Sequence, residues 1–383
     1  MGGRVRNLSI LQALSLHFEI ETITLVHDRD RMKDPGPVAS LGVWTPVLAW
    51  HRQSPVHRLV GQVGYRVAGT GYGREAWFLA SRSLARAVRA AVERRPPAIV
   101  HVAYWFTLRH LAGVGIRPPV WILDTHDIQF ERHARLGRPV SSKERGSEIR
   151  EWSRYDRLIA ITPQDEEALR GQLGPEAQIA TIGMGVDLSH WRRGESSRSG
   201  RERDAGTIAF YGNMASEANR VAARHLCEEI LPMLRRTRAG VQVLIVGADP
   251  PPDVRRLGTI PGVRVTGTVA DPRRELAGVD LVALTIPQGS GIRSRVCEVM
   301  AMELPVVAYP GALEGMGFEE ERDYLAARAA GEFAAQIDRL LGDPALARRL
   351  ARSALDETAR RYSVAATYGQ FASLYRGLLD RTA

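Results

Sequence analysis

The sequence predicts an α/β fold made of two doubly wound domains that face a cleft. Short apolar runs typical of buried strands alternate with helical segments through both halves of the chain. A stretch rich in Arg, Ser, Gly and Glu, residues 191–206, separates the halves and has the composition of a linker. The 383 residues are also more than one hydrophobic core usually holds. We therefore expect an N-terminal domain over residues 1–190, completed by a C-terminal helix at 363–383, and a second domain over residues 207–362.

The apolar runs give the order of the elements. In the first half, strands are predicted at residues 20–26, 98–102, 120–123, 158–161 and 179–182. In the second half, they are predicted at residues 207–211, 241–246, 263–266, 279–284 and 306–308. The helices predicted from apolar periodicity include residues 77–92, 219–235, a helical tail from about 331, and a last helix at 364–379.

The N-terminus departs from the usual order of such a domain. A doubly wound domain opens with a strand and then a glycine turn, but here a glycine loop, Gly2 and Gly3, comes first. An amphipathic helix is predicted next, with apolar residues on or near one face at Leu8, Leu11, Leu14 and Leu16. We therefore expect the first strand of the N-terminal domain to be missing, because the true start lies upstream or because the sequence is truncated.

The charge of the chain indicates anionic partners. The formal net charge is +9, and the excess is mostly arginine, which favours nucleotides, phosphates or an anionic membrane surface. No finger spacing, basic tail or repeat of basic and aromatic residues points to nucleic acid. Residues 52–95 hold nine arginines and two acids. This basic region either contacts a membrane peripherally or is an ordinary arginine-rich surface.

The cysteine content and the hydropathy pattern indicate a cytoplasmic protein. Cys227 and Cys297 each fall on a predicted helix, as reduced core thiols do. No apolar run approaches the roughly 20 residues of a membrane span, and the start carries no secretory signal. We expect a cytoplasmic location, with the inner face of the membrane as the alternative place of attachment.

The segment 287–310 carries the main chemical signal. It follows an apolar run at 279–286. A glycine-rich turn is predicted at Gly289, Ser290 and Gly291, and a short helix after it. In such a unit, the N–H groups of the turn and the positive end of the helix form an anion site at the carboxyl edge of the sheet.

Two arginines and one acid begin this helix. Arg293 and Arg295 oppose the helix macrodipole unless an anion joins them, so they predict a nucleotide diphosphate site together with Glu298. Because Arg295 and Glu298 are three residues apart, they could instead form a surface ion pair.

Further short motifs occur along about residues 1–320. They are Asp124-Thr125-His126-Asp127, residues 157–162, residues 182–187, residues 210–214, Val246-Gly247, residues 267–271, the segment 287–310 with Glu298, and Gly315. Met184 stands where the family named next usually has an asparagine. In order and spacing the chain resembles the retaining GT-B glycosyltransferases of family 4 (glycosyl transferases group 1). The resemblance implies two Rossmann-like domains and the transfer of a sugar, with retention, from a nucleotide-sugar donor to a hydroxyl acceptor. The acceptor would be a polysaccharide, a glycolipid or a natural product. Neither a bound metal nor another cofactor is implied.

The resemblance also implies roles for residues of the second domain. Glu298 would accept hydrogen bonds from the ribose hydroxyls, and Arg295, assisted by Arg293, would meet the diphosphate. The other donor-binding positions that it implies are Gly289, Ser290 and Gly291 for phosphate and sugar, Gly212 and Asn213 for the phosphates, and Val269 for the base.

In the first domain, the resemblance implies that Gly2 and Gly3 approach the donor phosphate and the acceptor. It implies that His126 contacts the transferred sugar, where it would orient a hydroxyl or stabilise charge, and Asp127 is the second candidate for a catalytic role. Read without the resemblance, His126 is a histidine that caps a loop at a strand end.

Two departures leave alternatives open. Ser290 stands eight residues before Glu298, where the family often has a glutamate that touches the sugar, and the usual Arg and Lys are absent around residues 212–219. One alternative is a catalytically inert GT-B partner subunit. Another is a nucleotide-sugar epimerase, although the carboxylates that its chemistry needs are not found. A dinucleotide dehydrogenase is excluded, since neither half has G-x-G-x-x-G after its first strand.

Overall fold

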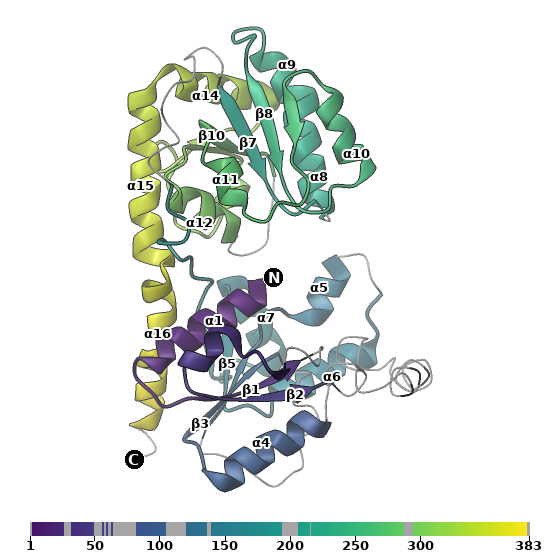
Figure 1. Ribbon diagram of the computed structural model, residues 1–383, viewed down its shortest axis with the longest axis vertical. Coiled ribbons are helices and arrows are strands. Elements are labelled where there is room, and N and C mark those ends of the chain that lie inside the picture. Colours follow the sequence, from purple (N-terminus) through teal and green to yellow (C-terminus); the bar gives the residue numbers. More distant parts are fainter. Residues whose placement is uncertain are drawn as a thin grey trace. The chain divides into compact units, whose positions relative to one another are not determined.

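The computed structural model describes residues 2–26, 32–49, 82–104, 120–135, 139–193, 206–214, 216–286 and 294–380, together with Val56, Leu59 and Val63. The chain forms two compact units (Figure 1). Unit 1 consists of Met1–Gly183 and Thr367–Ala383, and unit 2 of Met184–Ala366. The chain therefore crosses between the units twice, after Gly183 and after Ala366.

In the described residues, unit 2 is built on a parallel sheet of six strands in the order β12-β11-β10-β7-β8-β9. The strands are β7 (Thr207–Tyr211), β8 (Gln242–Val246), β9 (Val263–Val265), β10 (Leu281–Leu284), β11 (Val306–Ala308) and β12 (Leu325–Ala326). The winding reverses between β7 and β10, as in a doubly wound sheet. Ligands of such sheets bind at the carboxyl ends of the strands where this reversal occurs.

Both faces of this sheet are apolar, which explains why its strands have nearly continuous apolar sequences. Ile208 and Phe210 of β7 pack into one cluster of buried side chains, and Ala209 between them packs into another. The first cluster is covered by α8 (Glu217–Arg224), a π-helical segment (His225–Ile230), α9 (Leu231–Leu234) and α14 (Ala330–Gly342). The second is covered by α12 (Ser294–Ala301), and α15 (Pro344–Tyr362) contributes to both.

Shorter helices complete unit 2. They are α10 (Pro252–Arg256), the 3-10 turn η8 (Leu257–Thr259), α11 (Pro272–Leu276) and α13 (Pro310–Leu313). The carboxylate of Asp271 caps α11 by accepting from the N–H of Arg273 at 3.0 Å.

Unit 1 holds a parallel sheet in the order β3-β4-β5-β6 and a separate parallel pair, β1-β2, among its described residues. The strands are β1 (Glu21–Val26), β2 (Val43–Leu48), β3 (Ile99–Ala103), β4 (Val120–Asp124), β5 (Arg157–Ala160) and β6 (Ile179–Thr181). The helices are α1 (Gly2–Ser15), η2 (Gly36–Ser40), α4 (Arg82–Arg94), α5 (Gln129–Arg135), α6 (Ser142–Trp152), α7 (Pro163–Leu173) and α16 (Val364–Leu379). Figure 1 shows α1 in purple beside α16 in yellow, and the rings of Phe18 and Tyr375 lie 5.7 Å apart at this contact.

The α/β class and most of the predicted elements are confirmed. The strands at 207–211 and 306–308 and the helix at 364–379 coincide with β7, β11 and α16. Two strands were missed. β2 is half-exposed and contains Pro46, which argues against a strand, and β12 is too short for an apolar run.

The N-terminal glycines are not in a loop. The helix α1 begins at Gly2, so the glycine loop predicted at Gly2 and Gly3 is wrong. A glycine fits the first turn of a helix, where the N–H groups have no partner within the helix.

The buried face of α1 also differs from the prediction. Leu16 is 78% exposed, whereas Arg6, Ile10 and Leu14 are buried at a spacing of four residues. The physical reason is that Arg6 forms a buried ion pair, described below, which turns this side of the helix inward.

Of the predicted linker, residues 191–193 and 206 are described, and the first of these attach to unit 2. Trp191 packs against the second apolar cluster. The guanidinium of Arg193 donates to the carbonyl oxygens of Ala277 and Val279 at 2.8 and 2.7 Å.

Most of the basic region 52–95 lies outside the described residues. Its last part is α4, whose end carries Arg94 and Arg95 in ion pairs with Glu21 and Glu19. Membrane contact through this region stays a prediction. In the described part of the chain, no helix combines the length and apolarity of a bilayer span. Cys227 and Cys297 are buried and carry free thiols.

The buried Thr285, directly after β10, is expected to stabilise unit 2 through one hydrogen bond. Its hydroxyl donates to the carbonyl oxygen of Ala222 at 2.7 Å, where α8 widens into the π-helical segment. We predict that Thr285→Val lowers the free energy of unfolding by about 0.5–1.5 kcal/mol, the net worth of one hydrogen bond, because the carbonyl oxygen keeps its bond from the N–H of His225. Urea unfolding followed by circular dichroism measures the change.

The matched control is Thr237→Val. The hydroxyl of this exposed threonine also donates to a helix carbonyl, that of Leu234, at 3.0 Å. Its loss should change stability by less than about 0.5 kcal/mol, because water can replace the bond. Equal effects of the two substitutions would contradict the role given to Thr285.

Candidate functional site

The first group of candidate residues lies at the reversal point of the sheet in unit 2. Tyr211 ends β7, Gly212 and Asn213 follow it, and α12 presents Arg295 and Glu298. The predicted turn Gly289-Ser290-Gly291 and Arg293 lie outside the described residues.

Arg295 and Glu298 have buried polar atoms without partners. The Nη1 atom of Arg295 and the Oε2 atom of Glu298 are withdrawn from solvent, and neither has a hydrogen-bond partner among the described residues. The surface ion pair considered as the alternative is not among the ion pairs of the described residues, so that interpretation is not supported. Buried polar groups are costly when unpaired. A ligand that offers an acceptor to Arg295 and a donor to Glu298 would satisfy both.

The pKa shifts reflect the same burial. Burial raises the pKa of Glu298, against the opposing effects of the Tyr211 hydroxyl and the Arg295 charge. Burial also lowers the pKa of Arg295 and, together with the nearby Glu298 carboxylate, raises the pKa of Tyr211. This part of unit 2 therefore holds one cation and one carboxylate that are partly buried, each with one polar atom withdrawn from solvent.

Gly212 brings the backbone close to Arg295. A Cβ atom at Gly212 would lie 2.6 Å from Nη1 of Arg295 and 3.1 Å from Nδ2 of Asn219. The buried Asn219 amide in turn donates to the carbonyl oxygen of Asn213 at 2.7 Å, which fixes the turn after β7. A Cβ at Gly247, after β8, would lie 2.0 Å from the carbonyl oxygen of Gly212. Glycine is therefore required at Gly247 for the two turns to pack together, whereas a side chain at Gly212 would displace the guanidinium of Arg295.

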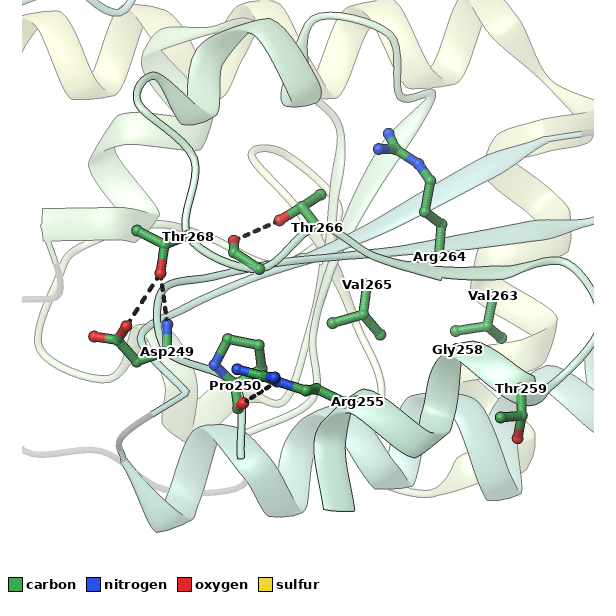
Figure 2. Close-up of a pocket in the computed structure, with 11 residues that line it drawn as sticks. Asp249, Pro250, Arg255, Gly258, Thr259, Val263, Arg264, Val265, Thr266 and Thr268 are labelled. Carbon is green, nitrogen blue, oxygen red and sulfur yellow. Dashed lines mark hydrogen bonds between the residues drawn. The ribbon is translucent and has the colours of Figure 1, made fainter. Parts of the chain in front are cut away.

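A groove of about 550 Å³ lies at the edge of the same sheet (Figure 2). Its lining includes Pro250, Arg255 and Val265. At one end, the hydroxyl of Thr268 accepts from the N–H of Asp249 at 3.0 Å and donates to its carboxylate at 3.1 Å. These two bonds hold Asp249 at a φ of 50°, which is uncommon for a residue with a side chain. Val269, the predicted base-facing residue, directly follows Thr268 and packs against the second apolar cluster.

The second group lies in unit 1, where His126 follows β4. Its side chain is 3% exposed, and its ring stacks on that of Tyr104 with centroids 4.1 Å apart. Both residues have a positive φ, 59° for His126 and 66° for Tyr104, and such strained residues gather at functional sites. Nε2 of His126 lies 3.8 Å from Asp124 and has no hydrogen-bond partner among the described residues.

Asp124 is held by a fully buried arginine. Arg6 of α1 donates to the two carboxylate oxygens at 2.8 and 3.3 Å, and both side chains are 0% exposed. Burial acts to raise the pKa of Asp124, but the charges of Arg6 and His126 hold it below its usual value. Burial lowers the pKa of His126, an effect that Asp124 opposes and Arg6 reinforces. Next to them, Nδ1 of His101 lies 2.5 Å from the Tyr375 hydroxyl, and burial lowers the pKa of His101 to about 4.

The other predicted residues of unit 1 are less tightly enclosed. Asp127 is half-buried, and its N–H donates to the carbonyl oxygen of Thr125 at 2.7 Å. Gly2 and Gly3 lie in the first turn of α1, directly before the turn that carries Arg6. The structure thus gathers Gly212, Arg295 and Glu298 in unit 2, and His126 beside Asp124 in unit 1.

Sequence reasoning missed three residues that complete these groups. Arg6 shares the stripe of Ile10 and Leu14, so a charged residue on an apolar stripe was the signal for it. Tyr211 ends β7 and Tyr104 directly follows β3, and only the position at a carboxyl end could have marked them. No group of three or more His, Cys, Asp or Glu side chains within the described ranges could hold a metal ion.

Comparisons with known proteins agree with both halves of the chain. Residues 39–190 match the family profile described as Glycosyltransferase Family 4, and residues 205–343 match the profile described as Glycosyl transferases group 1. No curated protein sequence matches the chain.

Solved structures with the same fold cover nearly the whole chain. Sucrose-phosphate synthase from Thermosynechococcus elongatus has a TM-score of 0.68 at 18% identity, over 99% of this chain and 93% of that one. HepE from Anabaena, in complex with UDP and glucose, has a TM-score of 0.64 at 16% identity, over 98% and 96% of the two chains. A glycosyltransferase from Rickettsia africae has a TM-score of 0.64 at 13% identity, over 98% and 94%. At these identities the likeness shows the fold.

The raised pKa of Glu298 predicts a pH-dependent cost to stability. A carboxyl group with a raised pKa in the folded state contributes stability below its unfolded pKa of 4.5, and loses it as the pH rises through the folded value. We predict that the melting temperature of Glu298→Gln, minus that of the wild type, is small near pH 4 and increases toward pH 8. Thermal scans without ligand across this range measure the difference.

Glu314→Gln is the control, because Glu314 is exposed. Its difference from the wild type should stay flat over the same range. A flat difference for Glu298→Gln as well would show that the carboxyl group titrates as it does in water.

Proposed function

The chain belongs to the GT-B glycosyltransferases, with family 4 and group 1 domains, and we propose that it transfers a sugar from a nucleotide-sugar donor to a hydroxyl acceptor. The proposal includes retention at the anomeric carbon and a reaction without a bound metal. The complex of the similar HepE with UDP and glucose supports a nucleoside diphosphate sugar as the donor.

The unpartnered atoms of Arg295 and Glu298 carry this proposal. A diphosphate oxygen would accept from Nη1 of Arg295, and a ribose hydroxyl would donate to Oε2 of Glu298. Hydrogen bonds between ionised groups are about twice as strong as neutral ones. In the transfer, negative charge develops on the leaving diphosphate, and a fixed cation in a water-excluded site stabilises it most. Gly212 leaves the space in which that cation lies.

The groove beside Thr268 fits the base of the donor. Its volume of about 550 Å³ lies within the range of small-molecule sites, roughly 300–1,000 Å³. It runs along β9 and ends at the segments that follow β8 and β9, in the same sheet whose β7 leads to Gly212. Val269 follows Thr268 but is not among the residues that line the groove, so its contact with the base stays a prediction.

His126 is proposed to orient a hydroxyl of the transferred sugar. Because its pKa is lowered, the imidazole is neutral at neutral pH, so one ring nitrogen donates and the other accepts. A neutral imidazole suits hydroxyl binding, and the unpartnered Nε2 is the atom available for it. Asp127 stays the second candidate.

Incubation with a panel of labelled nucleotide sugars tests the proposal. We expect slow hydrolysis of one donor and an increased melting temperature with that donor. NMR of the released or transferred sugar then gives the anomeric configuration, and activity in EDTA tests the independence from metal. Absence of both turnover and thermal stabilisation across the panel would instead support an inert partner subunit.

Arg295→Ala is predicted to weaken binding of the donor's nucleoside diphosphate by about 1.5–3 kcal/mol, the worth of a hydrogen bond to a charged group. This corresponds to a rise in Kd of about 10- to 150-fold, measured by calorimetry. Arg348→Ala, which removes an exposed arginine of α15, is the control and should leave Kd unchanged. Unchanged affinity in Arg295→Ala would remove the basis for the diphosphate site.

Glu298→Ala is predicted to abolish the discrimination between ribose and deoxyribose. The wild type should bind the nucleoside diphosphate more tightly than its 2′-deoxy and 3′-deoxy analogues, since Glu298 accepts from the hydroxyls. The variant should bind all three alike and keep the circular dichroism spectrum of the wild type. A variant that fails to fold would identify Glu298 as a structural residue.

A further inference from the structure

Arg6 is bound to more groups than an ion pair requires. Its Nε and Nη2 atoms donate to Asp124, Nη2 also donates to the carbonyl oxygen of Ile182 at 2.8 Å, and Nη1 donates to that of Gly183. The guanidinium carbon lies 5.8 Å from the ring centroid of Tyr368 and 5.6 Å from that of Phe371. The planar fork of an arginine can make all these contacts together, whereas a lysine cannot.

These contacts coincide with the places where the chain leaves and re-enters unit 1. Ile182 and Gly183 are the last two residues before the first crossing, and Tyr368 is the second residue after the other crossing. The side chain of Arg6 therefore contacts both segments of unit 1 that lie next to a crossing, residues 182–183 and Tyr368. The same side chain holds Asp124, whose carboxylate lies 3.8 Å from Nε2 of His126.

We propose that Arg6 is a positioning residue for the transfer reaction: it holds Asp124 beside His126 and fixes both crossing segments of unit 1 relative to that histidine. The inference rests on the proposed function, because it assigns to His126 a role toward the sugar. Stability alone does not account for Arg6, since a buried ion pair is often no more stabilising than apolar side chains of similar volume.

The charges around His126 support the same role. The ionised Asp124 raises the pKa of His126, and Arg6 lowers it. The third neighbour, His101, is neutral at pH 7 because burial lowers its pKa to about 4. The stacked ring of Tyr104 fixes the plane of the imidazole. Arg6 thus offsets the carboxylate and keeps His126 neutral in one orientation.

Two single variants separate the effect of the positive charge of Arg6 from the effect of the several hydrogen bonds that its guanidinium donates. Arg6→Lys keeps the charge, so the pKa of His126 should stay near that of the wild type, while amide exchange at residues 179–190 and 362–371 should accelerate. Arg6→Gln removes the charge, so the pKa of His126 should increase. The pKa is read by NMR of labelled histidine, with the His126 signal assigned by its loss in His126→Gln, and exchange is read by mass spectrometry.

A double variant separates positioning from folding. Arg6→Met with Asp124→Leu replaces the ion pair by apolar side chains and should fold, even if the single variants do not. We expect its kcat to fall by about 10- to 100-fold while KM for the donor stays within about twofold, as a misplaced catalytic group produces. Arg238→Lys is the matched control in unit 2, where Arg238 also joins a carboxylate and a carbonyl, both of Asp338. It should leave kcat, exchange in unit 1 and the pKa of His126 unchanged.

A double variant with wild-type kcat would overturn the proposal, and so would an unchanged pKa of His126 in Arg6→Gln. A wild type without turnover on any donor would instead refute the proposed function. In that case, the exchange and NMR measurements still decide whether Arg6 positions the crossings and His126.

Discussion

The buried ion pair between Arg6 and Asp124 determines how unit 1 is assembled. It joins α1 to the end of β4. The remaining donors of Arg6 bind the carbonyl oxygens of the residues after β6, and its guanidinium lies beside two aromatic rings of α16. A guanidinium and a carboxylate without solvent are costly unless every donor finds an acceptor. The four segments must therefore reach their places together, and this requirement fixes the surroundings of His126.

In unit 2, some buried polar atoms have no partner among the described residues. Its sheet is covered on both faces by apolar clusters, yet Nη1 of Arg295 and Oε2 of Glu298, near the reversal point, have no hydrogen-bond partner in the part of the chain that the structure describes. The packing of α12 on the sheet offsets the cost of holding these two atoms unpaired, so the proposed donor site needs no ligand to keep its form. A site formed in advance needs little reorganisation on binding, which strengthens each contact that it makes.

The sequence predicted the parts of the fold that are set locally. The strands of unit 2 are buried on both faces, so they appear as continuous apolar runs, and the glycine-rich segment before α12 marks the reversal point of the sheet. Arg295 and Glu298 were found because they lie on one short helix after that segment.

What the sequence did not predict depends on contacts between distant residues. Arg6 and Asp124 are 118 positions apart, and no local pattern pairs them. The stack of Tyr104 on His126 joins the ends of two different strands. The helical start at Gly2 was missed because a glycine pair before an apolar helix was interpreted as a loop, whereas Arg6, in the second turn of α1, anchors the helix through a distant ion pair.

The contact between Gly247 and Gly212 has a consequence for altering the sugar donor that this chain accepts. With no room for even a methyl group between the two turns, any side chain at Gly247 would push the backbone after β7 toward α12. The open groove along β9 offers more room, because Arg255, Gly258 and Thr259 line it and are exposed. Randomised libraries that keep the two glycines and sample these three positions would therefore alter the proposed base groove without disturbing the contact between the two turns.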